Sequence, residues 1–161
     1  MTAEKAVFRT TLDLESLAAT EALAARIAAG LEPGEPVALE GDLGAGKTAL
    51  ARAILEALGV TETVPSPTFT LVQEYDTSRF PVFHYDLYRI EDISEIAELA
   101  LDDAMIEGVA LIEWPERMRS LPDSTLRIRL EITGETARRT EISGPARWAK
   151  HFVGEGYVER G

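Results

Sequence analysis

The sequence has no cysteine and only two histidines, His84 and His151. Without cysteine there is no disulfide framework, no thiolate zinc site and no cysteine nucleophile. Two histidines also argue against a multi-histidine metal site. No apolar run approaches the roughly 18 residues that a helix needs to cross a bilayer, and residues 1–7 lack the apolar stretch of an export signal. We therefore expect a cytoplasmic protein that does not enter the membrane.

Basic residues are scarce as well. The chain has 16 Lys and Arg against 28 Asp and Glu, which gives a net charge of −12. This balance argues against a broad nucleic-acid or anionic-membrane binder, because both need a cationic face. Residues 86–116 hold ten of the acids and a single base, Arg89. That segment is either a solvated acidic face or a surface that meets charged partners.

The apolar pattern predicts one α/β domain over residues 1–161, in which 45% of the residues are hydrophobic. Helices are expected at 15–29, 47–58 and 91–105, with a short one at 145–153. Strands are expected at 37–40, 68–75, 82–85, 109–112 and 126–132, and residues 139–142 can pair with the last of these. We expect a mostly parallel sheet in a three-layer α/β sandwich, an antiparallel hairpin formed by 68–75 and 82–85, and a frayed tail at 154–161.

A phosphate-binding loop is the clearest motif. In Gly41-Asp-Leu-Gly-Ala-Gly-Lys-Thr48, two glycines bracket four residues and are followed by Lys and Thr, between an expected strand and an expected helix. Glycines let backbone N–H groups point at a phosphate, and the positive end of the following helix dipole favours the same anion. Lys47 adds a point charge, and the Thr48 hydroxyl is a candidate Mg²⁺ ligand.

The rarity of lysine supports this interpretation. The chain has three lysines and 13 arginines, yet it has a lysine at the loop position where a compact ammonium is needed. Two expected strands end in an acid, Asp86 and Glu113, as a nucleotide site at strand ends requires. One of them would reach Mg²⁺ and the other would orient or deprotonate the attacking water; the pattern leaves the assignment open. His84, two residues before Asp86, is either structural or catalytic.

Four stretches together resemble the bacterial TsaE (YjeE) family over about residues 15–140. They are Gly41–Thr48, Ser66-Pro-Thr-Phe-Thr-Leu-Val72, His84-Tyr-Asp-Leu-Tyr-Arg89 and Leu111-Ile-Glu-Trp-Pro-Glu116. Many families share the first stretch, and the other three are specific to this one. The resemblance implies a P-loop ATPase that uses ATP and Mg²⁺ in making threonylcarbamoyladenosine in tRNA. It also implies partnership with TsaB and TsaD, which ATP turnover would reset between rounds.

The resemblance also implies residue roles. The loop from Gly41, with Gly44, Ala45, Gly46 and Lys47, would hold phosphates; Thr48 and Glu113 would ligate Mg²⁺. Asp86 corresponds to the essential acid, and together with Lys47 it is the expected catalytic pair. Trp114 and Arg138 would lie at the nucleotide. Ala49 stands where relatives often have a second Thr; its backbone N–H remains, so the loss would be about 1 kcal/mol of binding energy.

Two other functions remain open from the sequence. A P-loop small-molecule kinase would fit this length; such kinases usually need a mobile lid that carries arginines over the phosphates, and Arg117 and Arg119 could be mistaken for these. A nucleotide-binding switch without useful turnover would carry the same loop. A kinase phosphorylates an acceptor, a switch binds without releasing phosphate, and the favoured ATPase releases free phosphate.

Overall fold

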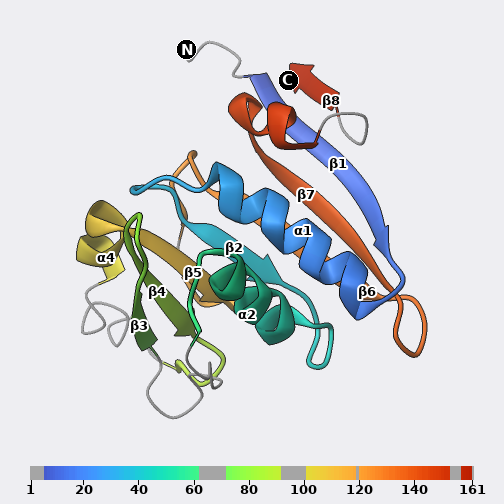
Figure 1. The fold of residues 1–161 in the computed structure, drawn as a ribbon, viewed down its shortest axis with the longest axis horizontal. Helices are drawn as coiled ribbons and strands as arrows, with labels where there is room; N and C mark the ends of the chain where they lie inside the picture. Colours follow the sequence, from blue (N-terminus) through green and yellow to red (C-terminus); the bar gives the residue numbers. More distant parts are fainter. Residues whose placement is uncertain (1–5, 62–71, 92–100, 119, 153–156, 161) are drawn as a thin grey trace.

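The computed structural model describes residues 6–61, 72–91, 101–118, 120–152 and 157–160. One eight-stranded sheet runs through it in the order β3-β4-β5-β2-β6-β7-β1-β8 (Figure 1). The strands are β1 (Ala6–Leu14), β2 (Val37–Glu40), β3 (Val72–Asp76), β4 (Pro81–Asp86), β5 (Val109–Glu113), β6 (Leu126–Ile132), β7 (Arg138–Pro145) and β8 (Tyr157–Arg160). The helices are α1 (Leu17–Gly30), α2 (Lys47–Ala57) and α4 (Leu101–Glu107), with 3₁₀ helices η1 (Pro115–Arg117) and η2 (Ala146–Phe152).

The α/β class is confirmed, and the sheet is mixed. The four central strands β4, β5, β2 and β6 pair in parallel. The flanking pairs β3–β4, β6–β7, β7–β1 and β1–β8 are antiparallel. The expected hairpin forms from β3 and β4. The expectation of a mostly parallel sheet therefore holds only for the centre, because neighbouring strands such as β6 and β7 are joined by a short turn, which permits only antiparallel pairing.

Two hydrophobic cores lie on opposite faces of the sheet. Helices α1 and α2 cover one face, where Val109 and Leu111 of β5 join the larger core. The alternating residues Ala110 and Ile112 join a smaller core with Leu101 of α4. Because successive strand residues point to opposite faces, β5 is buried on both sides. This gives the layered arrangement that places strand ends beside the loop before α2.

Some predicted elements differ from the structure. The sequence pattern did not predict β1, although Phe8, Thr10 and Leu14 are buried at alternate positions. Residues 157–160 are not frayed, since they pair with β1 as β8; residues 154–156 lie outside the described part. The short helix expected at 145–153 is the 3₁₀ helix η2. Residues 68–71 of the expected strand and 92–100 of the expected helix also lie outside the described residues. Within the described ranges, no helix has the length and apolarity to cross a membrane.

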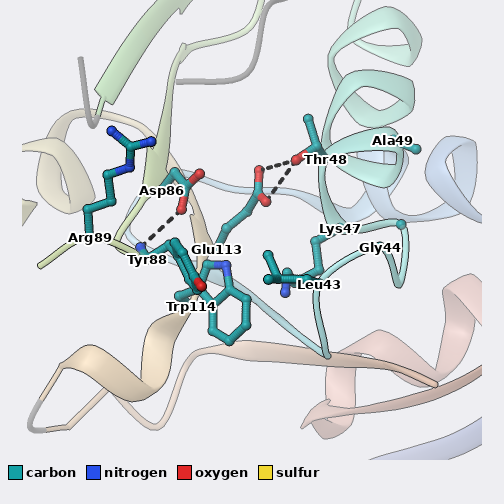
Figure 2. A pocket seen from close by; sticks show the side chains of 11 residues that line it. Leu43, Gly44, Lys47, Thr48, Ala49, Asp86, Tyr88, Arg89, Glu113 and Trp114 are labelled. Atoms are coloured by element: carbon teal, nitrogen blue, oxygen red, sulfur yellow. Dashed lines mark hydrogen bonds between the residues drawn. The ribbon is translucent and has the colours of Figure 1, made fainter. Parts of the chain in front are cut away.

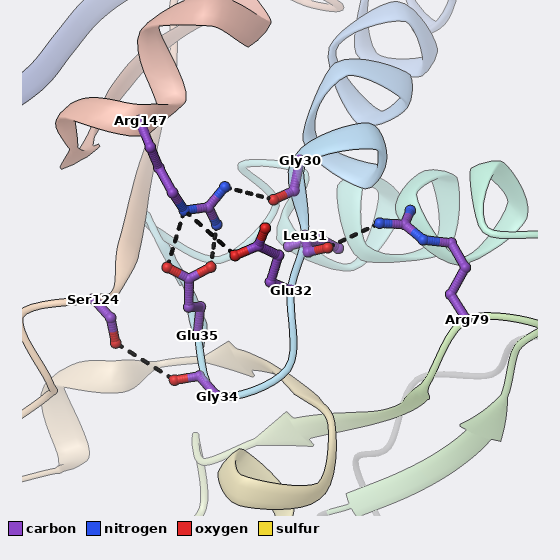
Figure 3. A network of polar contacts seen from close by, with 8 residues as sticks. All are labelled: Gly30, Leu31, Glu32, Gly34, Glu35, Arg79, Ser124 and Arg147. Carbon is purple, nitrogen blue, oxygen red and sulfur yellow. Dashed lines mark hydrogen bonds and ion pairs between the residues drawn. The ribbon is translucent and has the colours of Figure 1, made fainter.

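Two arginines hold the C-terminal end of α1 (Figure 3). Arg79, in the β3–β4 turn, donates to the carbonyls of Ala28 and Leu31 at 2.7 and 2.9 Å. Arg147 of η2 donates to the Gly30 carbonyl at 2.9 Å. The last carbonyls of a helix have no partners within it, and the negative end of the helix dipole attracts cations. The arginines therefore connect α1 to two distant parts of the chain.

Arg79→Ala is expected to lower the free energy of unfolding by about 2 kcal/mol, because two hydrogen bonds from a charged group are lost. Urea unfolding followed by circular dichroism measures this. Arg127→Ala is the matched control, since Arg127 makes an exposed 3.4 Å ion pair with Glu40, and such pairs contribute roughly 0–1 kcal/mol. Equal losses in the two variants would contradict the role given to Arg79.

Candidate functional site

The phosphate loop connects β2 to α2 through backbone conformations that favour glycine. At Gly41, φ is +143° and an added Cβ would lie 2.6 Å from the Leu130 carbonyl oxygen. Gly46 precedes α2 with φ of +104° and provides no side-chain cap. The first N–H groups of an α-helix lack partners within the helix. In α2 these N–H groups lie at the phosphate loop, so they are available to bind an anion.

A pocket of about 420 Å³ lies between this loop and the ends of β4 and β5 (Figure 2). Its walls bring together eight of the residues singled out from the sequence: Gly44, Gly46, Lys47, Thr48, Ala49, Asp86, Glu113 and Trp114. Asp86 and Glu113 meet because β4 and β5 are parallel and pair these two residues directly. Gly41, Ala45 and Arg138 do not line the pocket.

Glu113 is the buried acid nearest the loop, with an exposed fraction of 2%. The Thr48 hydroxyl donates to its Oε1 and Oε2 at 2.9 and 3.1 Å. His84 Nε2 lies 2.6 Å from Oε2, so His84 contacts Glu113. A hydroxyl and a carboxylate are oxygen ligands of the type that Mg²⁺ prefers. In the part of the chain that the structure describes, no cluster of three or more acidic or histidine side chains could hold a metal; phosphates and water would complete the coordination.

Asp86 is 9% exposed, and its Oδ1 accepts a hydrogen bond from the Tyr88 backbone N–H at 3.0 Å. Burial raises the pKa of Asp86, and the negative charge of Glu113 raises it further. The Tyr88 N–H and the charge of Lys47 oppose this shift. A carboxylate with a raised pKa is a stronger base. Asp86 is therefore suited to accept a proton at the pocket.

Lys47 lies against both the loop backbone and an aromatic ring. Its Nζ donates to the Gly41 carbonyl, lies 3.3 Å from the Asp42 carbonyl oxygen, and stands 3.5 Å from the centre of the Trp114 ring. Burial lowers the pKa of Lys47, and the negative charge of Glu113 opposes this shift more than that of any other acid. Trp114 is a non-glycine residue with positive φ, +60°, and such strained conformations concentrate at functional sites. Lys47 is therefore held between the loop backbone and the Trp114 ring at the wall of the pocket.

Arg138 contacts the loop from outside the pocket. Its Nε donates to the Ala45 carbonyl at 3.0 Å and a terminal nitrogen donates to the Gly44 carbonyl at 3.1 Å. Arg139, its neighbour, instead lies 3.6 Å from Asp13 in an exposed ion pair. Of the two arginines, Arg138 is thus the one beside the phosphate loop, where it supports the backbone.

Three pocket residues were not predicted from the sequence: Leu43, Tyr88 and Arg89. Tyr88 and Arg89 follow Asp86 within the same stretch, so their proximity to a proposed catalytic acid was the available signal. The Tyr88 ring packs against that of Trp114, with centroids 4.8 Å apart. Leu43 lies at the tip of the loop and is 64% exposed; a phosphate-loop pattern accepts any residue there, so nothing indicated it.

Comparison with known proteins shows the family. The family model described as "Threonylcarbamoyl adenosine biosynthesis protein TsaE" matches residues 14–140. The curated tRNA threonylcarbamoyladenosine biosynthesis protein TsaE of Bacillus subtilis (strain 168) is 43% identical over 121 residues, 74% of this chain and 75% of that protein. The protein of the same name from Nostoc sp. (strain PCC 7120) is 42% identical over 118 residues, 70% of this chain and 72% of its own.

The fold has a solved counterpart. A crystal structure of Bacillus subtilis YdiB matches with a TM-score of 0.72 and 31% sequence identity, covering 90% of this chain and 92% of that one. The family match includes the phosphate loop and the ends of both β4 and β5. The chain therefore belongs to the TsaE family of threonylcarbamoyl adenosine biosynthesis proteins.

Proposed function

We propose that this chain is a Mg²⁺-dependent ATPase of the cytoplasm, whose turnover resets the TsaB–TsaD complex that places threonylcarbamoyladenosine on tRNA. One observation carries the ATPase part. Lys47 and Thr48 of the loop face Asp86 and Glu113 across a single pocket. A phosphate-binding cation, two metal-type oxygen ligands and a basic carboxylate are the groups that phosphoryl transfer to water needs.

In the binding step, the loop N–H groups and Lys47 receive the phosphates of ATP. Lys47 leaves the Gly41 carbonyl for the β- and γ-phosphate oxygens. Thr48 and Glu113 would hold Mg²⁺, which supplies positive charge to the phosphate oxygens when bound. Arg138 keeps the loop backbone in place through the carbonyls of Gly44 and Ala45.

In the hydrolytic step, Asp86 accepts a proton from the attacking water. The water oxygen bonds to the γ-phosphorus as the bond from that phosphorus to the β–γ bridging oxygen breaks. ADP takes the electron pair of the broken bond, and inorganic phosphate leaves. Lys47 stabilises the negative charge that develops on the phosphate oxygens. The positions of Asp86 and Lys47 on the pocket wall support these roles.

The partnership rests on the family and on charge. The relatives are named for tRNA threonylcarbamoyladenosine biosynthesis, yet a net charge of −12 disfavours a broad grip on tRNA. We therefore assign tRNA binding to the partners and nucleotide turnover to this chain. Acids of α4, Asp102 and Asp103, lie in the acidic segment that we propose as a contact for basic partner surfaces.

A phosphate-release assay with ATP and MgCl₂, with and without TsaB and TsaD, tests the proposal. We expect slow release of inorganic phosphate from the chain alone and faster release with the partners. Phosphate transferred to a metabolite in place of water would support the kinase alternative. Nucleotide binding without release, even with both partners, would support the switch and contradict the ATPase.

A further inference from the structure

His84 is a buried titratable residue that the hydrolytic mechanism above leaves without a task. It lies on β4, is fully buried and does not line the pocket. Its Nε2 is 2.6 Å from Oε2 of Glu113, the proposed metal ligand. In the β4–β5 register His84 pairs with Leu111, two residues before Glu113. The imidazole therefore reaches the carboxylate from inside the protein, away from any bound nucleotide.

The contact also fixes where the ring carries its hydrogen. An ionised carboxylate only accepts hydrogen bonds, so Nε2 must be the donor. Nδ1 is buried and has no hydrogen-bond partner among the residues that the structure describes. The contact therefore needs a hydrogen on Nε2 that points at the Glu113 carboxylate.

We propose that His84 is a positioning residue that orients the Glu113 carboxylate for Mg²⁺, an inference that rests on the proposed function. Among the described residues, the Thr48 hydroxyl donates to this carboxylate and His84 Nε2 lies against its Oε2. When the Thr48 hydroxyl takes part in metal binding, its hydrogen bond to Glu113 rearranges. His84 still holds Oε2, so Oε1 stays directed toward Thr48 and the pocket. Outer partners of metal ligands fix ligand orientation in this way.

Calorimetric titration of ATP, in MgCl₂ and in EDTA, tests this on the full-length chain and two variants. His84→Leu removes the donor, and His84→Gln keeps an N–H of similar reach. We expect the Leu variant to reduce the gain in ATP affinity from Mg²⁺ by about tenfold or more, with unchanged affinity in EDTA. The Gln variant should retain most of that gain. Thr140→Val is the matched control, because Thr140 is buried, unpartnered and outside the pocket.

A His84→Leu protein with the full effect of Mg²⁺ would overturn the inference, and so would a Gln variant as impaired as the Leu variant. If Mg²⁺ raises the ATP affinity of the wild-type chain and of the Leu variant equally, only the inference about His84 fails and the ATPase proposal stands. A wild-type chain that binds no ATP in either buffer overturns both proposals.

Nitrogen-15 NMR of histidine-labelled protein gives a readout independent of nucleotide and of variant folding. The chain has two histidines, His84 and His151. The signals that disappear in the His84→Gln variant belong to His84, and so do the signals that remain in the His151→Gln variant. We expect Nε2 of His84 to carry a hydrogen that is bonded to the Glu113 carboxylate. A His84 ring with its hydrogen on Nδ1 could not donate to Glu113 and would overturn the inference.

Discussion

Replacing Lys47 with alanine is expected to abolish measurable ATP binding, with an affinity loss of about 100-fold or more, equivalent to ~3 kcal/mol. The reason is geometric, because the Lys47 ammonium is the cation on the pocket wall next to the loop backbone. It already lies against the Gly41 and Asp42 carbonyls, where phosphate oxygens would replace them. Calorimetric titration with ATP and MgCl₂ measures the loss.

The variant should remain folded. Burial lowers the pKa of Lys47, which means that its charge is costly in the folded chain. Lys150→Ala is the matched control, since Lys150 lies on η2 and away from the pocket. Normal ATP turnover by the Lys47→Ala protein would contradict the assignment of the site.

Asp86→Asn is expected to slow ATP hydrolysis by about 100-fold or more, the usual contribution of a general base, while raising thermal stability. The asparagine oxygen can still accept the Tyr88 N–H, so the local structure persists. The ionised carboxylate is unfavourable in the folded chain because it is buried beside Glu113. Removing its charge should therefore raise Tm, because the cost of the buried charge is removed.

The stability gain should depend on pH. The pKa of Asp86 is higher in the folded chain than the ordinary 3.8, so the folded chain binds this proton more tightly than the unfolded chain. The contribution of Asp86 to the free energy of unfolding therefore falls as pH rises from 3.8 through the raised pKa. The advantage of Asp86→Asn should grow over that interval and stay constant above it.

Phosphate release and urea unfolding across pH measure the two effects of Asp86→Asn. Asp13→Asn serves as control, because Asp13 is exposed and does not line the pocket. A variant that loses turnover and also loses stability would show that Asp86 supports the fold, and a variant with full turnover would exclude it as the base.

The loop and both acids could be predicted from sequence because each depends on local pattern. Spacing identifies Lys47 and Thr48, and an apolar run that ends in an acid identifies Asp86 and Glu113. The parallel pairing of β4 and β5 then brings the acids together, as expected for strand ends in an α/β sheet. The pocket therefore contains most of the residues that the pattern indicated.

Contacts that depend on side-chain direction could not be predicted in this way. His84 and Asp86 share a strand face, yet His84 lies against Glu113 on the next strand. Arg138 and Arg139 are adjacent, and the pleat of β7 decides which one reaches the loop. The strands at this end of the sheet were harder to predict. In the described sheet β8 pairs with β1 alone. Because β1 itself was not expected, nothing in residues 157–160 indicated a strand.

The position of β1 and β8 has a practical consequence. They lie on the side of the sheet opposite β3 (Figure 1). The strand β2 leads into the phosphate loop, and three strands, β6, β7 and β1, lie between it and β8. Strands from near both ends of the chain therefore lie on this side of the sheet, and β8 is its outermost strand, four places from β2. An affinity tag, fluorophore or surface anchor attached through β8 would leave the nucleotide-facing side open to the solvent and to other macromolecules.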